Sequence, residues 1–373
     1  MKIGVVTFWE TQDNYGQVLQ CYALIKFLRT IGHEAFLIRY RRQNSQLSLS
    51  HFLEKAMKYI LRPSSLVATL KWRKMVKVAS EDNRAHPRDF DGFRTRYIPG
   101  TRDEYDDEKL KSCPPEADVY VCGSDQVWGT MESAYFLQFG RDDVKRIAYA
   151  PSMGGRQPQG RIRQQMMDYL SKFDYISSRE EAGVEVLSRM GFKADLQPDP
   201  TLLLPPSDYR ELVNPLRAER PYVLLYLLGN AIAVDVSSIL LFVQQKGLEI
   251  RYVASQGRTD SHPKIYPTVE EWLGLIDGAT CVLTNSFHAA VFCLQLNTPF
   301  LVFPIRGGLA RMNNRIYDLL QKYGMQQRIY DGNLGRMFDK IDFTMFNKTR
   351  SKEVDRVSEL FRRILSSNNE ENF

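Results

Sequence analysis

The stretch Thr284–Pro304 constrains this chain most, because it predicts a helix between two buried strands. The apolar run Ala279–Leu283 that leads into it has the length of a buried strand. The residues before Phe287 favour a helix start, and apolar residues then recur at helical spacing as far as Leu296. An Asn-Thr-Pro sequence ends this helix before a second apolar run. The pattern is strand, helix, strand, with His288 in the first helical turn.

The start of this helix is a place where an α/β protein can bind an anion. Unpaired backbone N–H groups and the positive end of the helix dipole point outward there, at the carboxyl edge of the sheet. His288 adds a titratable side chain at the same position. A lone histidine near a helix start is also a common packing residue, so the interpretation depends on what else converges on the site.

Composition places the chain among soluble globular proteins. Its 373 residues suffice for two domains, and 43% hydrophobic and 25% charged residues are ordinary proportions. The longest apolar run, Tyr222–Leu228, is too short to span a bilayer, and no signal-peptide core follows Met1. The five cysteines and five histidines are scattered without the spacing of metal ligands. We therefore expect a cytoplasmic protein with no metal and no cofactor.

Positive charge is concentrated in one segment. Arg39–Lys77 holds ten Lys or Arg against the single acid Glu54, a balance of +9 in a chain whose total is +6, so the remainder sums to −3. Apolar residues near helical spacing accompany these cations, which predicts a basic helical excursion over about 41–80. Such an element can lie on anionic lipid headgroups, or it can be a helix with a solvated charged face. Nucleic acid is not favoured, because stacking aromatics and a reading motif are missing.

The first half of the chain begins as a Rossmann-like unit. Lys2–Phe8 reads as a strand, Val18–Thr30 as a helix, and Ala35–Tyr40 as the next strand. The connecting loop has no GxGxxG pattern, so hydride chemistry is not supported. It carries Asn14 and Tyr15 before the helix, where they could contact an anion or a sugar hydroxyl, or simply form a long turn.

A second group of polar residues follows the predicted strand Ala117–Cys122. Ser124, Asp125 and Trp128 place hydrogen-bonding groups and an aromatic ring at the same sheet edge. This combination is typical of a site for a sugar or another polar ligand. Asp125 is a candidate base or acceptor contact, with a loop-capping aspartate as the alternative reading.

Arg179 follows a third predicted strand, Phe173–Ser177. Ser178 and Glu181 have the spacing of a capping box, which would place Arg179 in the first helical turn. A cation there opposes the helix dipole unless an anion is bound. The position therefore favours Arg179 as part of an anion site.

The polar segment Ser207–Arg220 after two prolines predicts a domain boundary. We expect an N-terminal Rossmann-like domain over 1–205 on the acceptor side and a C-terminal Rossmann-like domain over 206–345 on the donor side. The remaining residues, 346–373, predict a packing helix that crosses back to the first domain. The expected fold class is α/β, with two Rossmann-like domains facing a cleft.

More cations follow the last predicted strand. Arg306, Arg311 and Arg315 lie in or near one loop, and the last two share a face if that segment is helical. Together with Arg179 and His288 they would make the cleft suitable for a small polyanion.

Six blocks, taken together and in this order, resemble the polysaccharide pyruvyl transferase family. The likeness covers nearly the whole chain and implies a GT-B-like fold, phosphoenolpyruvate as donor and a cell-surface glycan sugar as acceptor. The blocks are DNYGQVLQCYAL (13–24), VCGSDQVW (121–128), SSREEAGVEVL (177–187), DPTLLL (199–204), TNSFHAAVFC (284–293) and RMNNRIYDLL (311–320).

The resemblance implies roles for particular residues. Arg179 matches the arginine that binds phosphoenolpyruvate, and His288 matches the histidine that is both ligand and acid. Ser286 and Phe287 then adjoin the donor. Many relatives have an arginine at the position of Ser286, and here we expect Arg311, or else Arg306 or Arg315, to supply the charge.

The predicted reaction places a cyclic pyruvate ketal on a hexose, with galactose at O4 and O6 as the expected case. Its acceptor would be a polyprenyl-diphosphate-linked oligosaccharide of a capsule or exopolysaccharide, reached from the inner face of the membrane. The helix dipole disfavours the imidazolium of His288 in an empty site, and a bound phosphate and carboxylate reverse this. Two alternatives remain: a GT-B glycosyltransferase using a nucleotide sugar, and an inactive glycan-binding or assembly protein.

Overall fold

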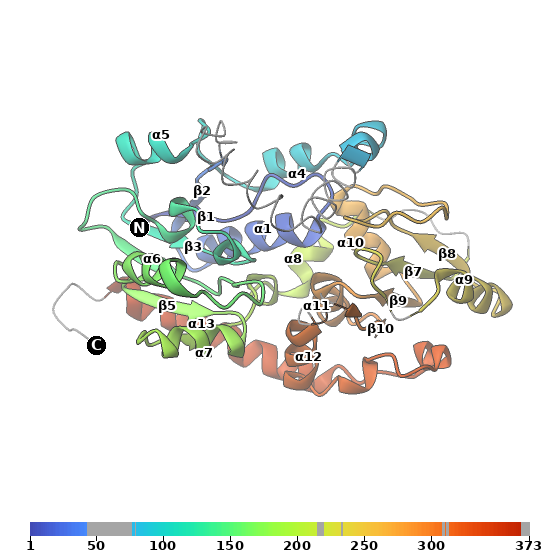
Figure 1. Cartoon of the computed structure of the whole chain (residues 1–373). Coiled ribbons are helices and arrows are strands. Elements are labelled where there is room, and N and C mark those ends of the chain that lie inside the picture. Colours follow the sequence, from blue (N-terminus) through green and yellow to red (C-terminus); the bar gives the residue numbers. More distant parts are fainter. Residues whose placement is uncertain are drawn as a thin grey trace, which may run out of the picture.

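The chain folds into two parallel sheets, as seen in a computed structural model (Figure 1). The structure describes residues 1–42, 77–78, 80–214, 220–232, 234–307, 310 and 313–366. Most of the predicted basic excursion and Arg311 lie outside these residues.

The first sheet has six parallel strands in the order β2-β1-β3-β4-β5-β6. Its strand order reverses between β1 and β3, which is the switch point at which open α/β sheets bind ligands. The strands are β1 (Lys2–Val6), β2 (Glu34–Leu37), β3 (Val119–Cys122), β4 (Lys145–Ala148), β5 (Tyr175–Ser178) and β6 (Asp195–Leu196).

The second sheet has four parallel strands in the order β10-β9-β7-β8, so the same reversal occurs between β7 and β9. Both sheets are crossed by helices in the manner of Rossmann-like units. The strands are β7 (Tyr222–Tyr226), β8 (Glu249–Tyr252), β9 (Cys281–Thr284) and β10 (Phe300–Val302). The helices whose bounds the structure gives are α1 (Tyr15–Thr30), α4 (Phe90–Tyr97), α5 (Asp107–Ser112), α6 (Gly160–Leu170), α7 (Glu181–Arg189), α8 (Pro206–Arg210), α9 (Val236–Gln245), α10 (Val269–Asp277), α11 (Phe287–Leu296), α12 (Asn313–Lys322) and α13 (Thr344–Ser366).

Side-chain caps determine where several of these helices begin. Asn14 accepts a hydrogen bond from the backbone N–H of Gln17, and α1 therefore starts three residues before the predicted Val18. Thr268 and Glu271 form the predicted capping box of α10. The capping box predicted for Ser178 and Glu181 is wrong, because α7 begins only at Glu181 and has no side-chain cap.

One continuous apolar core joins the two halves. The Tyr15 ring of α1 stacks on Trp272 of α10, with ring centroids 4.9 Å apart, and the Tyr15 hydroxyl donates to the Pro267 carbonyl oxygen. Helix α13 runs beneath both halves (Figure 1), and its Phe361 packs against Phe27 of α1. These contacts hold the two carboxyl edges in a defined relation.

The predicted α/β class with two Rossmann-like halves and a cleft is confirmed, in a GT-B-like arrangement. All strands of the first sheet precede residue 206 and all strands of the second follow it. The predicted C-terminal helix does contact the first half, since Arg356 donates to the Gln197 side chain at 3.0 Å. Within the described residues, no helix is both long and apolar enough to cross a bilayer.

The shared core generates the first prediction. Replacing the buried Trp272 by alanine removes the partner of Tyr15 and leaves a cavity between the halves, so the free energy of unfolding should fall by about 3–5 kcal/mol. Urea denaturation followed by circular dichroism measures this change. The control is Leu241→Ala on the exposed face of α9, which should change stability by less than about 0.5 kcal/mol. Equal losses in the two variants would contradict the shared core.

Candidate functional site

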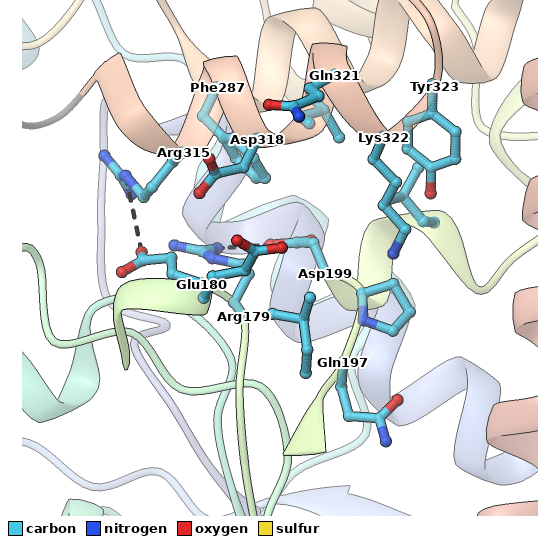
Figure 2. A pocket seen from close by; sticks show the side chains of 15 residues that line it. Arg179, Glu180, Gln197, Asp199, Phe287, Arg315, Asp318, Gln321, Lys322 and Tyr323 are labelled. Atoms are coloured by element: carbon cyan, nitrogen blue, oxygen red, sulfur yellow. Dashed lines mark hydrogen bonds and ion pairs between the residues drawn. The ribbon is translucent and has the colours of Figure 1, made fainter. Parts of the chain in front are cut away.

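A cavity of about 380 Å³ lies between the halves, where β5 and β6 end in the first half and α11 and α12 begin in the second. Figure 2 shows charged side chains from both halves converging on it. Its size is that of a small-molecule site. The lining residues are Arg179, Glu180, Glu181, Leu196, Gln197, Pro198, Asp199, Leu202, Phe287, Arg315, Asp318, Leu319, Gln321, Lys322 and Tyr323.

Arg179 is the cation at the floor of this cavity. Its Nη1 donates to Asp199 Oδ2 at 2.5 Å, and its Nη2 lies 3.7 Å from Asp125 Oδ1. The guanidinium carbon is 4.9 Å from the centroid of the Phe287 ring. Burial alone would lower the pKa of Arg179, but Asp199 and Asp125 raise it, so the guanidinium stays charged. Nε and Nη2 are buried and have no hydrogen-bond partner among the described residues.

Asp199 is the residue that sequence reasoning missed. Besides Arg179, its carboxylate accepts from the Thr201 backbone N–H at 3.0 Å and from the Thr201 hydroxyl at 2.6 Å. Burial would raise the pKa of Asp199, but His288 and Arg179 hold it well below its ordinary value. The available signal was the Asp-Pro-Thr run after β6, which served only as part of a family block.

His288 lies in the first turn of α11, as predicted. Ser286 caps this helix by accepting a hydrogen bond from the Ala289 backbone N–H. The His288 Nε2 is 3.6 Å from Asp199 Oδ2, so the imidazole faces a carboxylate. Its other side packs on α1 at Gly16, where an added Cβ would lie only 2.1 Å from Nδ1. Glycine at this position is therefore what allows the two helices to bring His288 to Asp199.

Arg315 of α12 is the second cation in the cavity. Its Nε lies 3.9 Å from Glu180 Oε1, and its guanidinium carbon is 5.9 Å from the Phe287 ring centroid. With the Gln126 amide oxygen turned toward it, Arg315 Nη1 donates to that oxygen at 2.9 Å. Burial first, and then the charge of Arg179, lower the pKa of Arg315. The two guanidiniums thus repel each other, and an anion between them would relieve that repulsion.

Arg306 is not part of the cavity lining. Arg306 is exposed on the loop before α12, and Arg311 lies outside the described residues. Of the three arginines considered for the missing charge, Arg315 is the one that the structure places beside Phe287 and Arg179. The preference for Arg311 stays a prediction, because that residue lies outside the described part of the chain.

Three predicted acceptor contacts are corrected by the structure. Tyr15, Ser124 and Trp128 are buried, and each is engaged by the protein itself. The Ser124 hydroxyl donates to the Ala150 carbonyl oxygen at 2.9 Å. The indole of Trp128 stacks on Phe136 and donates to the Tyr135 carbonyl oxygen at 3.1 Å. These side chains hold the loops and core together and do not line the cavity.

Asn14 and Asp125 have structural contacts as well. Asn14 is the N-cap of α1. Asp125 follows Gly123, whose φ of +114° and close approach to the Tyr149 carbonyl leave no room for a side chain. The Asp125 carboxylate is 5% exposed, adjoins Arg179 and is not part of the cavity lining. Asp125 therefore adjoins Arg179 beneath the cavity lining, and its role as base or acceptor contact stays a prediction.

The arrangement suits recognition of a small anion. Unpaired donors of Arg179, the guanidinium of Arg315 and the N-terminus of α11 face one enclosed volume, with His288 beside it. In the part of the chain that the structure covers, no group of three or more His, Cys, Asp or Glu side chains could hold a metal ion.

Comparisons with known proteins agree with the sequence resemblance. The sequence model of the family described as polysaccharide pyruvyl transferase matches residues 14–306 of the chain. This range includes Arg179, Asp199 and His288, and it ends before Arg315. A search of curated protein sequences found no significant match.

Solved structures with a similar course of the chain are distant in sequence. The UDP-GlcNAc 2-epimerase of Methanocaldococcus jannaschii is 13% identical, with 97% of this chain and 100% of that chain covered at a TM-score of 0.49. The UDP-GlcNAc 2-epimerase of Neisseria meningitidis bound to UDP-GlcNAc is 9% identical, covering 99% and 100% at 0.43. The spinosyn rhamnosyltransferase SpnG is 12% identical, covering 98% and 100% at 0.41. Nothing about this chain's substrate follows from these values.

The packing of His288 on α1 gives a second prediction. Gly16→Ala should lower the free energy of unfolding by about 1–3 kcal/mol, because the new methyl group overlaps the imidazole. The same substitution in a His288→Gly background should cost much less, because glycine also removes the His288 Cβ, which would lie 2.5 Å from the added methyl group. Gly129→Ala, where an added Cβ makes only a 3.4 Å contact, is the control. Equal costs of Gly16→Ala in the two backgrounds, measured by chemical denaturation, would refute the contact.

The depressed pKa of Asp199 gives a third prediction. An acid whose folded-state pKa is lowered stabilises the fold above its unfolded-state pKa, and this contribution disappears as the pH falls. The difference in unfolding free energy between the wild type and Asp199→Asn should therefore shrink as pH falls from about 5 toward 2. Denaturant titrations at several pH values measure it. A difference that stays constant over this range would show that Asp199 is not the titrating group.

Proposed function

This chain belongs to the polysaccharide pyruvyl transferase family, and we propose that it transfers the pyruvate unit of phosphoenolpyruvate onto a hexose with release of phosphate. Membership of the family makes the chain a transferase of polysaccharide biosynthesis that acts on a sugar acceptor. The proposal adds the donor and the product, a cyclic ketal that bridges two hydroxyls, with O4 and O6 of galactose as the expected pair.

The observation that carries the proposal is the pair of guanidiniums beside one histidine. Arg179 and Arg315 both lie against the Phe287 ring, and Arg179 keeps two buried nitrogens without a hydrogen-bond partner among the described residues. Phosphoenolpyruvate carries a phosphate and a carboxylate on adjacent positions. Guanidinium groups bind both kinds of oxyanion through paired hydrogen bonds. A small molecule with two anionic groups is thus the ligand that this site suits best.

His288 is the proposed acid. The ionised Asp199 attracts an imidazolium across 3.6 Å, and a bound donor anion adds to that attraction. From this position His288 would protonate the methylene carbon of phosphoenolpyruvate, which makes the adjacent carbon electrophilic. A sugar hydroxyl then adds to that carbon, phosphate leaves, and a second hydroxyl closes the ketal. The proposed reaction needs neither a redox cofactor nor a metal.

Arg315 is proposed to replace the arginine that many relatives have at the position of Ser286. Ser286 itself is buried and serves as the cap of α11. Arg315 reaches the same ring from the next helix, α12, and supplies the second positive charge to the cavity. The charge requirement is thus met by a residue at a different position in the sequence.

The natural acceptor is proposed to be a lipid-linked repeat unit of a capsule or exopolysaccharide, carried on polyprenyl diphosphate. The enzyme would then work in the cytoplasm at the inner face of the membrane. The excess of Lys and Arg in Arg39–Lys77 supports this location, since such a segment is attracted to anionic lipid.

The fourth prediction tests the reaction. The wild type should release inorganic phosphate from phosphoenolpyruvate only when a galactoside with free O4 and O6 is present. His288→Ala should lower the rate by about 100-fold or more, because the proton donor is lost. A coupled phosphate assay measures the release. Absence of release with every galactoside, together with thermal stabilisation by nucleotide sugars, would replace the proposal by a glycosyltransferase.

A matched pair of arginine variants extends the fourth prediction to the binding of the donor. Arg315→Gln should weaken the binding of phosphoenolpyruvate by about 10- to 150-fold, as expected for the loss of one charge-assisted contact. Arg306→Gln removes an exposed arginine of the preceding loop and should leave the affinity unchanged. Isothermal titration with phosphoenolpyruvate distinguishes the two. Equal affinities of both variants would remove Arg315 from the donor site.

A further inference from the structure

The cavity extends beyond the two arginines along helix α12. Asp318 and Gln321 lie three residues apart on this helix and line the same cavity as Arg315. Leu196 and Leu319 provide an apolar wall next to them, and Leu196 is 36% exposed. A region with a carboxylate, an amide and an apolar wall beside an anion site is suited to a polyhydroxylated ligand.

The acids of the cavity differ in what engages them. Asp199 is fully buried and is held by Arg179 and Thr201. Glu180 accepts a hydrogen bond from the Ser152 hydroxyl at 2.5 Å and lies 3.9 Å from Arg315. Neither carboxylate is free to take a proton from a ligand without losing these contacts.

Asp318 differs from both, and the fourth acid of the lining, Glu181, is an exposed side chain at the start of α7. Asp318 is partly exposed, and within the described residues it makes no hydrogen bond or ion pair. Lys322, one turn further along α12, is engaged by Glu353 of α13. Figure 2 shows the Asp318 carboxylate pointing from α12 into the cavity, toward the side chains of Arg179 and Glu180. Asp318 is thus an unengaged carboxylate directed at the place where the donor is proposed to bind.

The surroundings of Asp318 also favour proton uptake. Burial first, and then the negative charges of Glu181 and Glu180, raise its pKa above the ordinary value for an aspartate. A general base works best when its pKa lies near the working pH, so this shift makes Asp318 a stronger base than an exposed aspartate.

From this geometry we propose that Asp318 is the general base that takes the proton of the attacking sugar hydroxyl, and that the region between Asp318, Gln321 and Leu196 is the acceptor subsite. The inference rests on the proposed function, since it presupposes phosphoenolpyruvate at Arg179 and Arg315. It moves the acceptor from the loop after β3, where the sequence alone had placed it, to the cavity side of α12.

The proton balance of the reaction requires such a group. One proton adds to the methylene carbon of phosphoenolpyruvate, and the hydroxyl oxygen forms a bond to the adjacent carbon while its own proton passes to Asp318. The carbon–oxygen bond to phosphate then breaks, with its electron pair leaving on phosphate. The second hydroxyl forms the second bond and gives up its proton. Of the two hydroxyl protons, one balances the proton added to carbon and the other leaves on phosphate.

The fifth prediction compares Asp318→Asn with Asp355→Asn, an exposed aspartate on α13 outside the cavity. Asp318→Asn should bind phosphoenolpyruvate within about twofold of the wild type, because the donor contacts are intact. With methyl β-galactopyranoside as acceptor, its turnover should fall by about 100- to 10,000-fold, the range for loss of a general base. For the wild type we expect kcat to rise with pH as Asp318 ionises, and this rise should disappear in Asp318→Asn. Asp355→Asn should match the wild type in all three measurements.

The outcomes separate this inference from the proposed function. If Asp318→Asn has the same turnover as the wild type, the role of Asp318 is overturned and the proposed function still stands. A loss of phosphoenolpyruvate affinity of more than about tenfold would place Asp318 at the donor and overturn the acceptor subsite. No turnover by the wild type itself would reject the proposed function. If Asp318→Asn does not fold, Asp318→Glu decides: a shifted pH profile with retained donor affinity supports the role, and an unshifted profile contradicts it.

Discussion

The site depends on one buried ion pair, between Arg179 of the first sheet and Asp199 of the loop after β6. Removing both charges from water is costly, and their attraction offsets this cost only if the remaining donors and acceptors are satisfied. Thr201 satisfies the carboxylate, and Asp125 and the Phe287 ring accompany the guanidinium. Two nitrogens of Arg179 remain without a hydrogen-bond partner in the described structure. This local deficit is what an anionic ligand would correct, so the arrangement that weakens the empty protein favours the bound state.

The geometry of this pair is maintained by contacts far from it. His288 reaches Asp199 from the second sheet, so the distance between them depends on how the halves pack. Tyr15 and Trp272 fix the two halves on one side, and α13 crosses from one to the other. Gly16 then sets how closely α1 and α11 approach. A single core that spans both halves therefore limits the opening of the cleft, unlike two independent domains joined by a linker.

The fold could be predicted from the sequence because two kinds of signal agree in most elements. These are the spacing of apolar residues and the capping, glycine and proline residues that begin and end helices and strands. The strand, helix, strand unit around α11 was predicted from apolar spacing alone, and its limits differ by only one or two residues. The sequence also placed Arg179 and His288 shortly after the ends of strands, where the structure has them. It could not separate exposed from buried polar residues, and this is why Tyr15, Ser124 and Trp128 were assigned to a ligand. Asp199 was missed because its partners Arg179 and His288 lie 20 or more positions away in the chain.

The two ends of the cavity differ in charge, because cations lie at the inner end and a carboxylate lies at the outer end. At the inner end, Arg179 and Arg315 each have an acid nearby, and burial, followed by the charge of Arg179, lowers the pKa of Arg315. At the outer end, burial, followed by the negative charges of Glu181 and Glu180, raises the pKa of Asp318. An anion bound at the inner end relieves the repulsion between the two guanidiniums. Its negative charge also adds to the charges that raise the pKa of Asp318. Donor binding would thereby strengthen the base at the outer end, so that the acceptor hydroxyl is activated only after the donor is in place.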